Sequence, residues 1–339
     1  MLSNYNLQSK KVFWLVSLML IVVSSLLLSG CSDTKAASKV HRVGILNGFP
    51  PFASIIDGFK GKMTELGYVE GENIIYDIQT PNFGPAAEQS ALEQFVADEV
   101  DLIFVFPTGP SLAAKNVTKG TNIPVVFAMA GLEGNDLVES VSQPGGNVTG
   151  VRFAGPDSTI KRLEFLLEIV PQTKRLYITY NKDYPASQVS AEALRPVASS
   201  MGITLIEEPV ASVEELQANL QTHAAAEDID AILVMPDDLT QSPGGWPMIA
   251  QFAAEHNIPI GGAAAFTADT GALFSYVADF VEVGEEAAPL ADKILNGTPA
   301  GTIPVITPVE YLRINYKAAE ELGLTVPDGL LGLASEVIR

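Results

Sequence analysis

Short apolar runs alternate along the chain with longer segments whose apolar side chains fall on one helical face. The apolar run 43–46, for example, precedes a segment that ends at Gly67. One face of that segment is formed by Ile56, Phe59, Met63 and Leu66. Apolar strands that are joined through amphipathic helices are typical of a parallel sheet covered on both faces.

This alternation occurs in two series. The first series has predicted strands at 43–46, 73–80, 101–106 and 124–129. The segment 142–151, "SQPGGNVTGV", then interrupts the pattern, and we interpret it as a crossing between two lobes. The second series has predicted strands at 175–180, 203–210, 230–235 and 258–263. The pattern therefore predicts an α/β fold with two successive parallel sheets, and the family resemblance described below implies that each forms a doubly wound lobe.

Two predicted helices contain an interior proline, Pro196 in one and Pro289 in the other. A proline inside a helix removes one hydrogen bond and costs about 3 kcal/mol. We therefore expect each of these helices to kink or to be split at its proline.

The N-terminal region has the pattern of a secretory signal. Lys10 and Lys11 precede a long apolar run, residues 12–28, and small residues follow it. The run is also close to the lower limit for a membrane-spanning helix, so a retained N-terminal anchor is the alternative.

The stretch 28–31, Leu-Ser-Gly-Cys, resembles a bacterial lipobox, the processing site of lipoproteins. This resemblance implies cleavage before Cys31 and lipidation of Cys31. Residues 1–30 are thus predicted to be a lipoprotein signal peptide. Residues 31–40 are small and polar and are predicted to form a flexible tether.

Composition narrows the possible partners. The chain of 339 residues carries 20 basic and 40 acidic residues, and such a surface repels nucleic acid and anionic lipid headgroups. We therefore expect no nucleic-acid partner, and a lipid rather than a basic patch as the attachment to the membrane. Cys31 is the only cysteine, so the rest of the chain has no internal disulfide.

The C-terminal segment 271–339, which ends in "NYKAAEELGLTVPDGLLGLASEVIR", resembles the ABC-transporter substrate-binding proteins of the tryptophan/tyrosine-uptake type. Three further stretches are similar to the same family, in the same order: "SLAAKN", "QPGGNVTGV" and "KRLEFLLEIVPQTKRLYITYN". The resemblance covers roughly residues 41–339.

The resemblance implies a type I periplasmic-binding fold, with two lobes joined by three crossings and a ligand in the cleft between them. Lobe 1 is then expected to contain residues 41–148 and about 278–304. Lobe 2 is expected to contain residues 149–277 and about 305–339. Ligands of open parallel sheets bind at the carboxyl ends of the strands, so two facing edges would form one cleft.

In lobe 1, Thr108 and Ser111 follow a predicted strand and begin a helix. Backbone N–H groups and the positive end of the helix dipole suit a carboxylate there, helped by both hydroxyls. The alternative is that one of these residues only caps the helix.

In lobe 2, Ser187 is a second candidate at a helix start, and Tyr184 is a candidate for stacking on a ligand or an ordinary loop aromatic. Asp237 or Asp238 could pair with an ammonium group, a charge-assisted bond that is strong in a desolvated cleft. The alternative for this pair is an acidic loop and a helix cap.

Three further candidates follow predicted strands. Phe49 and Phe266 would present aromatic faces from the two lobes, which suits a flat or aromatic ligand. Asp279 matches an acidic position of the family at the second crossing, where a hinge role and a ligand contact are both open.

Catalytic and metal-binding patterns are missing from the sequence. His41, His223 and His256 are far apart in sequence and have no partner at metal-ligand spacing. The sequence contains no P-loop, no G-x-G-x-x-G after the first strand, no H-E-x-x-H and no G-x-S-x-G. We therefore expect no catalytic residue, no metal and no cofactor.

The resemblance predicts a monomeric, solute-binding lipoprotein of an ABC importer, which captures a small ligand, an amino acid and by preference an aromatic one. Its partners would be an ABC permease with its ATPase, and the membrane through lipid on Cys31. Its place would be the outer face of the cytoplasmic membrane. One alternative is a ligand-sensing lipoprotein that signals to a membrane receptor. Another is an enzyme on a Rossmann-like scaffold.

Overall fold

The computed structural model describes residues 39–81, 84–223 and 228–339. Residues 41–339 form one compact unit, and the fold described below is that of this unit. The predicted signal peptide and Cys31 lie outside the described residues. Within the described ranges, no helix is both long enough and apolar enough to cross a membrane.

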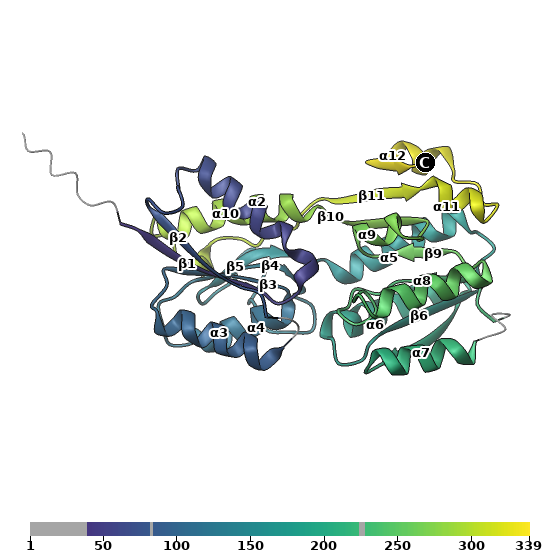
Figure 1. Ribbon diagram of the computed structural model, residues 1–339, viewed down its shortest axis with the longest axis horizontal. Helices are drawn as coiled ribbons and strands as arrows, with labels where there is room; N and C mark the ends of the chain where they lie inside the picture. Colours follow the sequence, from purple (N-terminus) through teal and green to yellow (C-terminus); the bar gives the residue numbers. More distant parts are fainter. Residues whose placement is uncertain (1–38, 82–83, 224–227) are drawn as a thin grey trace, which may run out of the picture. The chain divides into compact units, whose positions relative to one another are not determined.

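Among the described residues, the first sheet has five parallel strands in the order β2-β1-β3-β4-β5. These strands are β1 (His41–Asn47), β2 (Ile74–Gln79), β3 (Leu102–Phe106), β4 (Val125–Ala130) and β5 (Val148–Arg152). Its helices are η1 (Pro50–Phe52), α2 (Ser54–Glu65), α3 (Pro85–Ala97), α4 (Thr108–Val117), α10 (Phe280–Leu295) and η2 (Ala300–Thr302). Helices α2 and α10 cover one face of the sheet, and α3 and α4 cover the other (Figure 1).

The second sheet has seven strands within the described part of the chain, in the order β12-β11-β10-β9-β8-β6-β7. These strands are β6 (Arg175–Asn181), β7 (Thr204–Val210), β8 (Ala231–Leu233), β9 (Ile260–Gly262), β10 (Phe274–Ala278), β11 (Glu310–Asn315) and β12 (Glu336–Ile338). All its neighbouring strands run parallel except β10 and β11. Its helices are α5 (Gly155–Ile169), α6 (Pro185–Ser200), α7 (Val213–Thr222), α8 (Gly245–His256), α9 (Ala265–Asp269), α11 (Tyr316–Glu321) and α12 (Asp328–Leu333).

Each sheet is buried on both faces, as the apolar runs of the sequence predict. All five residues of β3 are buried, and so are all six of β4. One core lies on each face of each sheet, and the helices on both sides supply their apolar stripes to these cores. The predicted α/β fold with two doubly wound lobes is therefore confirmed, with β11 as the antiparallel exception in the second sheet.

The chain passes three times between the two sheets. The first passage joins β5 to α5, and the second joins β10 to α10 at Asp279. The third follows Ile306, which pairs with Val151 of β5, and leads into β11. Strand β5 extends the first sheet to Arg152, four residues beyond position 148, where we expected lobe 1 to end. The first crossing therefore begins after Arg152, and not within residues 142–151, which we interpreted as the crossing.

The return of α10 to the first lobe depends on close contact with α2. A Cβ atom on Gly284 would lie 2.1 Å from the carbonyl oxygen of Ile55, and one on Gly58 would lie 2.0 Å from that of Val281. Because neither glycine has a side chain, the two helix backbones approach more closely than any larger residue would allow.

The predicted breaks at two prolines do not occur. Helix α6 continues across Pro196, and α10 continues across Pro289. Pro196 lies on the exposed side of its helix, where the carbonyl group that loses its intrahelical partner can bond to water. A split at either proline is therefore wrong, because packing of the buried faces outweighs the local cost of a proline, while a kink, the other expected outcome, stays a prediction.

Candidate functional site

A pocket lies between the carboxyl ends of the strands of the two lobes. Its volume is about 510 Å³, part of it open to solvent. From the first lobe and the adjoining crossings, the pocket is lined by Phe49, Phe52, Pro107, Thr108, Met129, Phe153 and Phe280. From the second lobe, it is lined by Tyr184, Ala186, Pro236, Asp237, Asp238, Gln241, Ala263, Ala264 and Val277.

The first-lobe wall is mainly aromatic. The rings of Phe49 and Phe52 meet edge to face, with centroids 4.7 Å apart. The ring of Phe280 lies 4.6 Å from that of Phe52. Such pairs hold one another in fixed orientations, so the wall presents preformed aromatic surface to a ligand. Phe49 lies at the pocket, as predicted from its place after β1.

The start of α4 supplies the polar part of this wall. Thr108 lines the pocket, and its hydroxyl oxygen accepts a hydrogen bond from the Gly131 N–H group at 3.0 Å. The hydroxyl hydrogen of Thr108 is thereby left to be donated. The N–H groups of Thr108 and Gly109 lie in the first turn, where a helix offers them no acceptor. The predicted donors for a carboxylate are therefore present at this position.

Ser111 has a different role from the predicted one. Its side chain is buried and donates to the carbonyl oxygen of Pro107 at 2.6 Å, one turn back along the same helix. Ser111 is not part of the pocket lining. Ser187 is likewise buried outside the pocket lining, but it donates to the carbonyl oxygen of Pro236, in the loop after β8, at 3.0 Å.

Asp237 lines the second-lobe wall and is only 4% exposed. One carboxylate oxygen accepts from the N–H groups of Leu239 and Thr240, at 2.8 and 2.7 Å. The other accepts from the Thr240 hydroxyl at 2.6 Å. Burial raises the pKa of Asp237 to about 7, in spite of these three donors. Asp237 therefore fixes its own loop and also adds partial negative charge to the pocket near neutral pH.

Asp238 is the more accessible carboxylate of the pair. It lines the pocket, and one of its oxygens accepts from the Asn181 side-chain amide at 2.8 Å. Tyr184 also lines the pocket, and burial, with the charges of Asp238 and Asp237, raises the pKa of its hydroxyl above the usual range. Among the residues that the structure describes, the Tyr184 hydroxyl has no hydrogen-bond partner.

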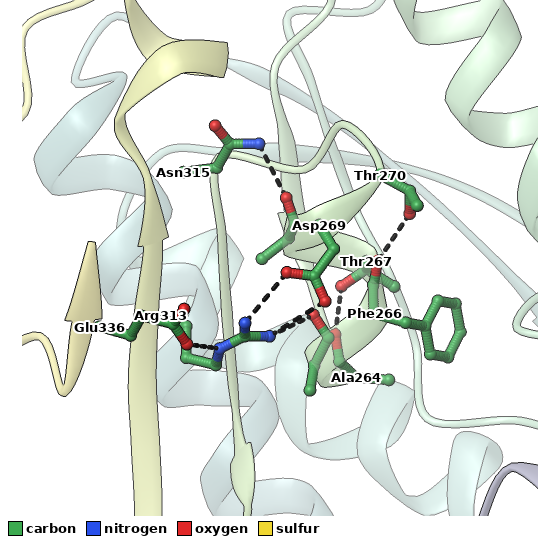
Figure 2. A network of polar contacts seen from close by, with 10 residues as sticks. Ala264, Phe266, Thr267, Asp269, Thr270, Arg313, Asn315 and Glu336 are labelled. Carbon is green, nitrogen blue, oxygen red and sulfur yellow. Dashed lines mark hydrogen bonds and ion pairs between the residues drawn. The ribbon is translucent and has the colours of Figure 1, made fainter. Parts of the chain in front are cut away.

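Phe266 lies outside the pocket lining, because α9 begins one residue earlier and turns its ring away. The ring packs instead against Trp246 of α8, with centroids 6.2 Å apart. Arg313 of β11 holds α9 from the other side, donating to the Ala265 carbonyl at 2.9 Å and to Asp269 at 3.0 Å (Figure 2). The pocket wall after β9 is formed by the small residues Ala263 and Ala264.

Asp279 also lies outside the pocket lining, at the crossing between β10 and α10. Its carboxylate accepts from the N–H groups of Val281 and Glu282, at 2.8 and 3.1 Å, and so caps α10. In this geometry Asp279 caps α10 at the crossing, and its hinge role and its ligand contact both stay predictions.

Several lining residues were not predicted from the sequence. The most informative are aromatic or polar and follow strand ends: Phe52, Phe153, Phe280 and Gln241. Phe52 and Phe280 lie within three residues of the candidates Phe49 and Asp279. A search that admitted every aromatic residue near a strand end would have found them.

The charged side chains that line the pocket, Asp237 and Asp238, are both carboxylates. Within residues 39–81, 84–223 and 228–339, no lysine, arginine or histidine lines it. Among the same residues, no group of three or more histidine, cysteine, aspartate or glutamate side chains is placed to hold a metal ion. The arrangement suits recognition of a small molecule with a cationic group and an apolar body.

Comparison with known proteins identifies the family. Residues 44–338 match the model of the family described as "ABC transporter substrate binding protein". A curated tyrosine-binding protein of Clostridioides difficile is 29% identical over 316 residues, which cover 89% of this chain and 88% of the relative.

Solved structures agree with this. A structure from Streptococcus pneumoniae described as an ABC domain in complex with L-Trp has a TM-score of 0.79 and 24% identity, over 88% of this chain and 100% of that chain. A ligand-free, open substrate-binding protein with adhesive properties from Clostridium difficile has a TM-score of 0.68 and 27% identity, with the same coverage.

Proposed function

The chain belongs to the family of ABC transporter substrate-binding proteins, and from this premise we propose that it captures an aromatic amino acid in the pocket between its lobes. The captured ligand would be delivered to an ABC permease that is driven by its ATPase.

The observation that carries this proposal is the unequal composition of the two pocket walls. The first-lobe wall presents the rings of Phe49, Phe52 and Phe280, which suit a flat apolar group. The second-lobe wall presents Asp237 and Asp238, which suit an ammonium group. A molecule with an aromatic body and an ammonium group fits both walls at once.

The carboxylate of an amino acid has a site at the start of α4. The Thr108 hydroxyl and the free N–H groups of the first turn are the donors that an anion needs there. The named ligands of two relatives, tyrosine and L-Trp, combine the same three groups, and they support an aromatic amino acid as the ligand of this chain.

Capture requires the lobes to move. The TM-score is higher to the L-Trp complex than to the ligand-free, open structure, 0.79 against 0.68, although the open structure is slightly more similar in sequence. This difference supports a fold with two arrangements of the lobes, related by rotation at the three crossings. No covalent step is needed for capture and release.

The proposal includes an anchor outside the described residues. Cleavage before Cys31 and lipid on its sulfur would hold the monomeric protein at the outer face of the cytoplasmic membrane. Replacing Cys31 by serine is expected to move the protein from the membrane fraction to the soluble fraction. Unchanged membrane association of the Cys31→Ser protein would instead support the retained apolar run 12–28 as the anchor.

Isothermal titration calorimetry tests the ligand. The domain from residue 32 onwards is titrated with L-tryptophan, L-tyrosine and L-phenylalanine, and with L-glutamate and D-ribose as controls. We expect saturable binding of at least one aromatic amino acid and none of the controls. Calorimetry is preferable to tryptophan fluorescence, because Trp246 does not line the pocket. If none of the three aromatic amino acids binds, the proposal is contradicted.

A further inference from the structure

Gln241 belongs to the second-lobe wall of the pocket, and its side-chain amide is held in one orientation. The side chain is 9% exposed and lines the pocket. Its Nε2 atom donates to the carbonyl oxygen of Met235, two residues after β8, at 2.8 Å. Because a carbonyl oxygen can only accept, the amide nitrogen must lie on that side and the Oε1 atom on the other.

The Oε1 atom of Gln241 is an acceptor that the protein leaves open. Across residues 39–81, 84–223 and 228–339, no N–H or O–H group donates to it. It is also not one of the fully enclosed polar atoms that lack a partner in these ranges, so it is accessible. Since the rest of the side chain is buried and the residue lines the pocket, this oxygen is accessible from the pocket.

The order of the strands places this acceptor within the wall. Asp238 is held toward β6, because the Asn181 amide at the end of that strand donates to its carboxylate. Gln241 is held at β8, the next strand, and Ala263 and Ala264 follow β9, the strand after that. Neighbouring strands lie about 4.8 Å apart. The Gln241 oxygen therefore lies between a carboxylate and small residues that leave room for the body of a ligand.

The chemistry of the two acceptors separates their roles. An ammonium group bonds more strongly to a carboxylate than to a neutral amide oxygen, so we expect it at Asp238. One oxygen of that carboxylate accepts from Asn181, and the other accepts from no group in the described part of the chain. The neutral oxygen of Gln241 then remains for a neutral donor farther along the ligand.

We propose that Gln241 is a specificity-determining residue, which accepts a hydrogen bond from a donor on the aromatic ring of the ligand, the N–H group of an indole or the O–H group of a phenol. This proposal rests on the proposed function and deepens it. A ring without a donor would exclude water from the amide oxygen and leave it unpaired, and this penalty selects against such a ring.

Calorimetry with two pairs of ligands tests this selection in the wild-type protein. L-Tryptophan is compared with L-3-benzothienylalanine, in which a sulfur atom replaces the ring N–H group with almost the same shape. L-Tyrosine is compared with L-phenylalanine, which lacks the ring O–H group. We expect at least one donor-bearing ligand to bind about tenfold more tightly than its analogue.

Gln241→Met tests the residue itself, because methionine is similar in length and is only a weak acceptor. The variant also loses the bond to Met235, so all affinities can fall together. The readout is therefore the ratio of the two Kd values within the pair that wild-type protein distinguishes, which we expect to fall to less than about twofold. Gln251→Met is the matched control, because Gln251 is exposed on α8 and bonds to Glu255. Its ratio should equal that of wild-type protein.

A crystal structure of wild-type protein with the preferred ligand gives a second measurement, which does not depend on the folding of a variant. We expect the donor atom of the ligand's ring within about 3.2 Å of the Oε1 atom of Gln241. A ring donor that bonds to a different group would overturn the inference.

The outcomes separate this inference from the proposed function. If wild-type protein binds the two members of each pair equally well, or if Gln241→Met keeps the wild-type ratio, the inference is overturned while the proposed function stands. If wild-type protein binds none of the three natural aromatic amino acids, the proposed function fails and the inference fails with it.

Discussion

The two walls of the pocket differ in chemistry although both are built at the carboxyl ends of parallel strands. The first-lobe wall consists mainly of phenylalanine rings that pack on one another, with the start of α4 as its polar part. The second-lobe wall contains two carboxylates, an amide and small alanine residues, with Tyr184 as its one aromatic ring among the described lining residues and Pro236 and Val277 as further apolar members. The difference indicates a division of roles, in which the aromatic wall provides most of the affinity and the acidic wall provides selection by charge.

The largest effect is expected when the aromatic wall is truncated. Phe49→Ala removes one ring from the pocket and also the edge-to-face support of Phe52. Loss of that apolar contact is worth about 2 kcal/mol, or roughly a 30-fold increase in Kd for an aromatic amino acid. The Kd is measured by calorimetry.

Phe266→Ala is the control for this prediction. Phe266 is a half-buried phenylalanine that packs against Trp246 outside the pocket, whereas Phe49 is buried and lines the pocket. We expect a loss of thermal stability and an unchanged Kd. If Phe266→Ala weakened binding as much as Phe49→Ala, the assignment of affinity to the first-lobe wall would be wrong.

The next effect concerns the acidic wall and pH. Burial raises the pKa of Asp237 to about 7 in the folded protein, while an unfolded aspartate titrates near pH 4. Between these values the folded chain keeps a proton that the unfolded chain has released. The free energy of unfolding should therefore decrease as pH rises, by up to about 1.4 kcal/mol per pH unit, and level off above pH 7.

Urea denaturation at pH 5, 6, 7 and 8 measures this dependence. Asp237→Asn is expected to flatten it, because asparagine is neutral throughout and still accepts from the N–H groups of Leu239 and Thr240. If the free energy of unfolding had the same slope against pH in wild type and variant, Asp237 would already be ionised in the folded protein between pH 5 and pH 8.

A smaller effect is expected at the second carboxylate. Asp238→Asn keeps the acceptor for Asn181 but removes the charge. Replacing a charge-assisted bond by a neutral one costs about 1 kcal/mol, so the Kd for an aromatic amino acid should rise about fivefold. Asp183→Asn serves as the control, because Asp183 is exposed in the loop before Tyr184. Equal losses for the two variants would indicate a general effect of net charge.

The smallest effect is expected for Tyr184→Phe. The hydroxyl group of Tyr184 has no hydrogen-bond partner within the described residues. The contribution of Tyr184 to ligand binding should therefore come from its aromatic ring. We expect a change in Kd of less than about threefold, whereas Tyr184→Ala should cost about tenfold. A large loss for Tyr184→Phe would place the hydroxyl, and not only the ring, in contact with the ligand.

The sequence predicted the fold well because its main signals are local. Apolar runs and amphipathic faces mark the strands and helices of both sheets, and most predicted elements appear within a few residues of their expected positions. The uninterrupted helices at Pro196 and Pro289 are the exceptions. There the local rule failed, because tertiary packing decides between a broken and a continuous helix.

The residues of the pocket were harder to predict from the sequence than the fold, for a physical reason. Order along the chain shows that a residue follows a strand, but not where its side chain points. Ser111 and Ser187 follow strands, and each turns back to a backbone carbonyl. Phe266 also follows a strand, but α9 directs its ring toward Trp246.

Small-angle X-ray scattering tests the central claim most directly, that the two walls close on a ligand between them. The radius of gyration is measured for the domain from residue 32 onwards, with and without a saturating aromatic amino acid, and for Phe49→Ala at the same ligand concentration. We predict a decrease for wild-type protein on saturation, and a smaller one for the variant below its own saturation. An unchanged radius in wild-type protein that calorimetry shows to be saturated would contradict the account.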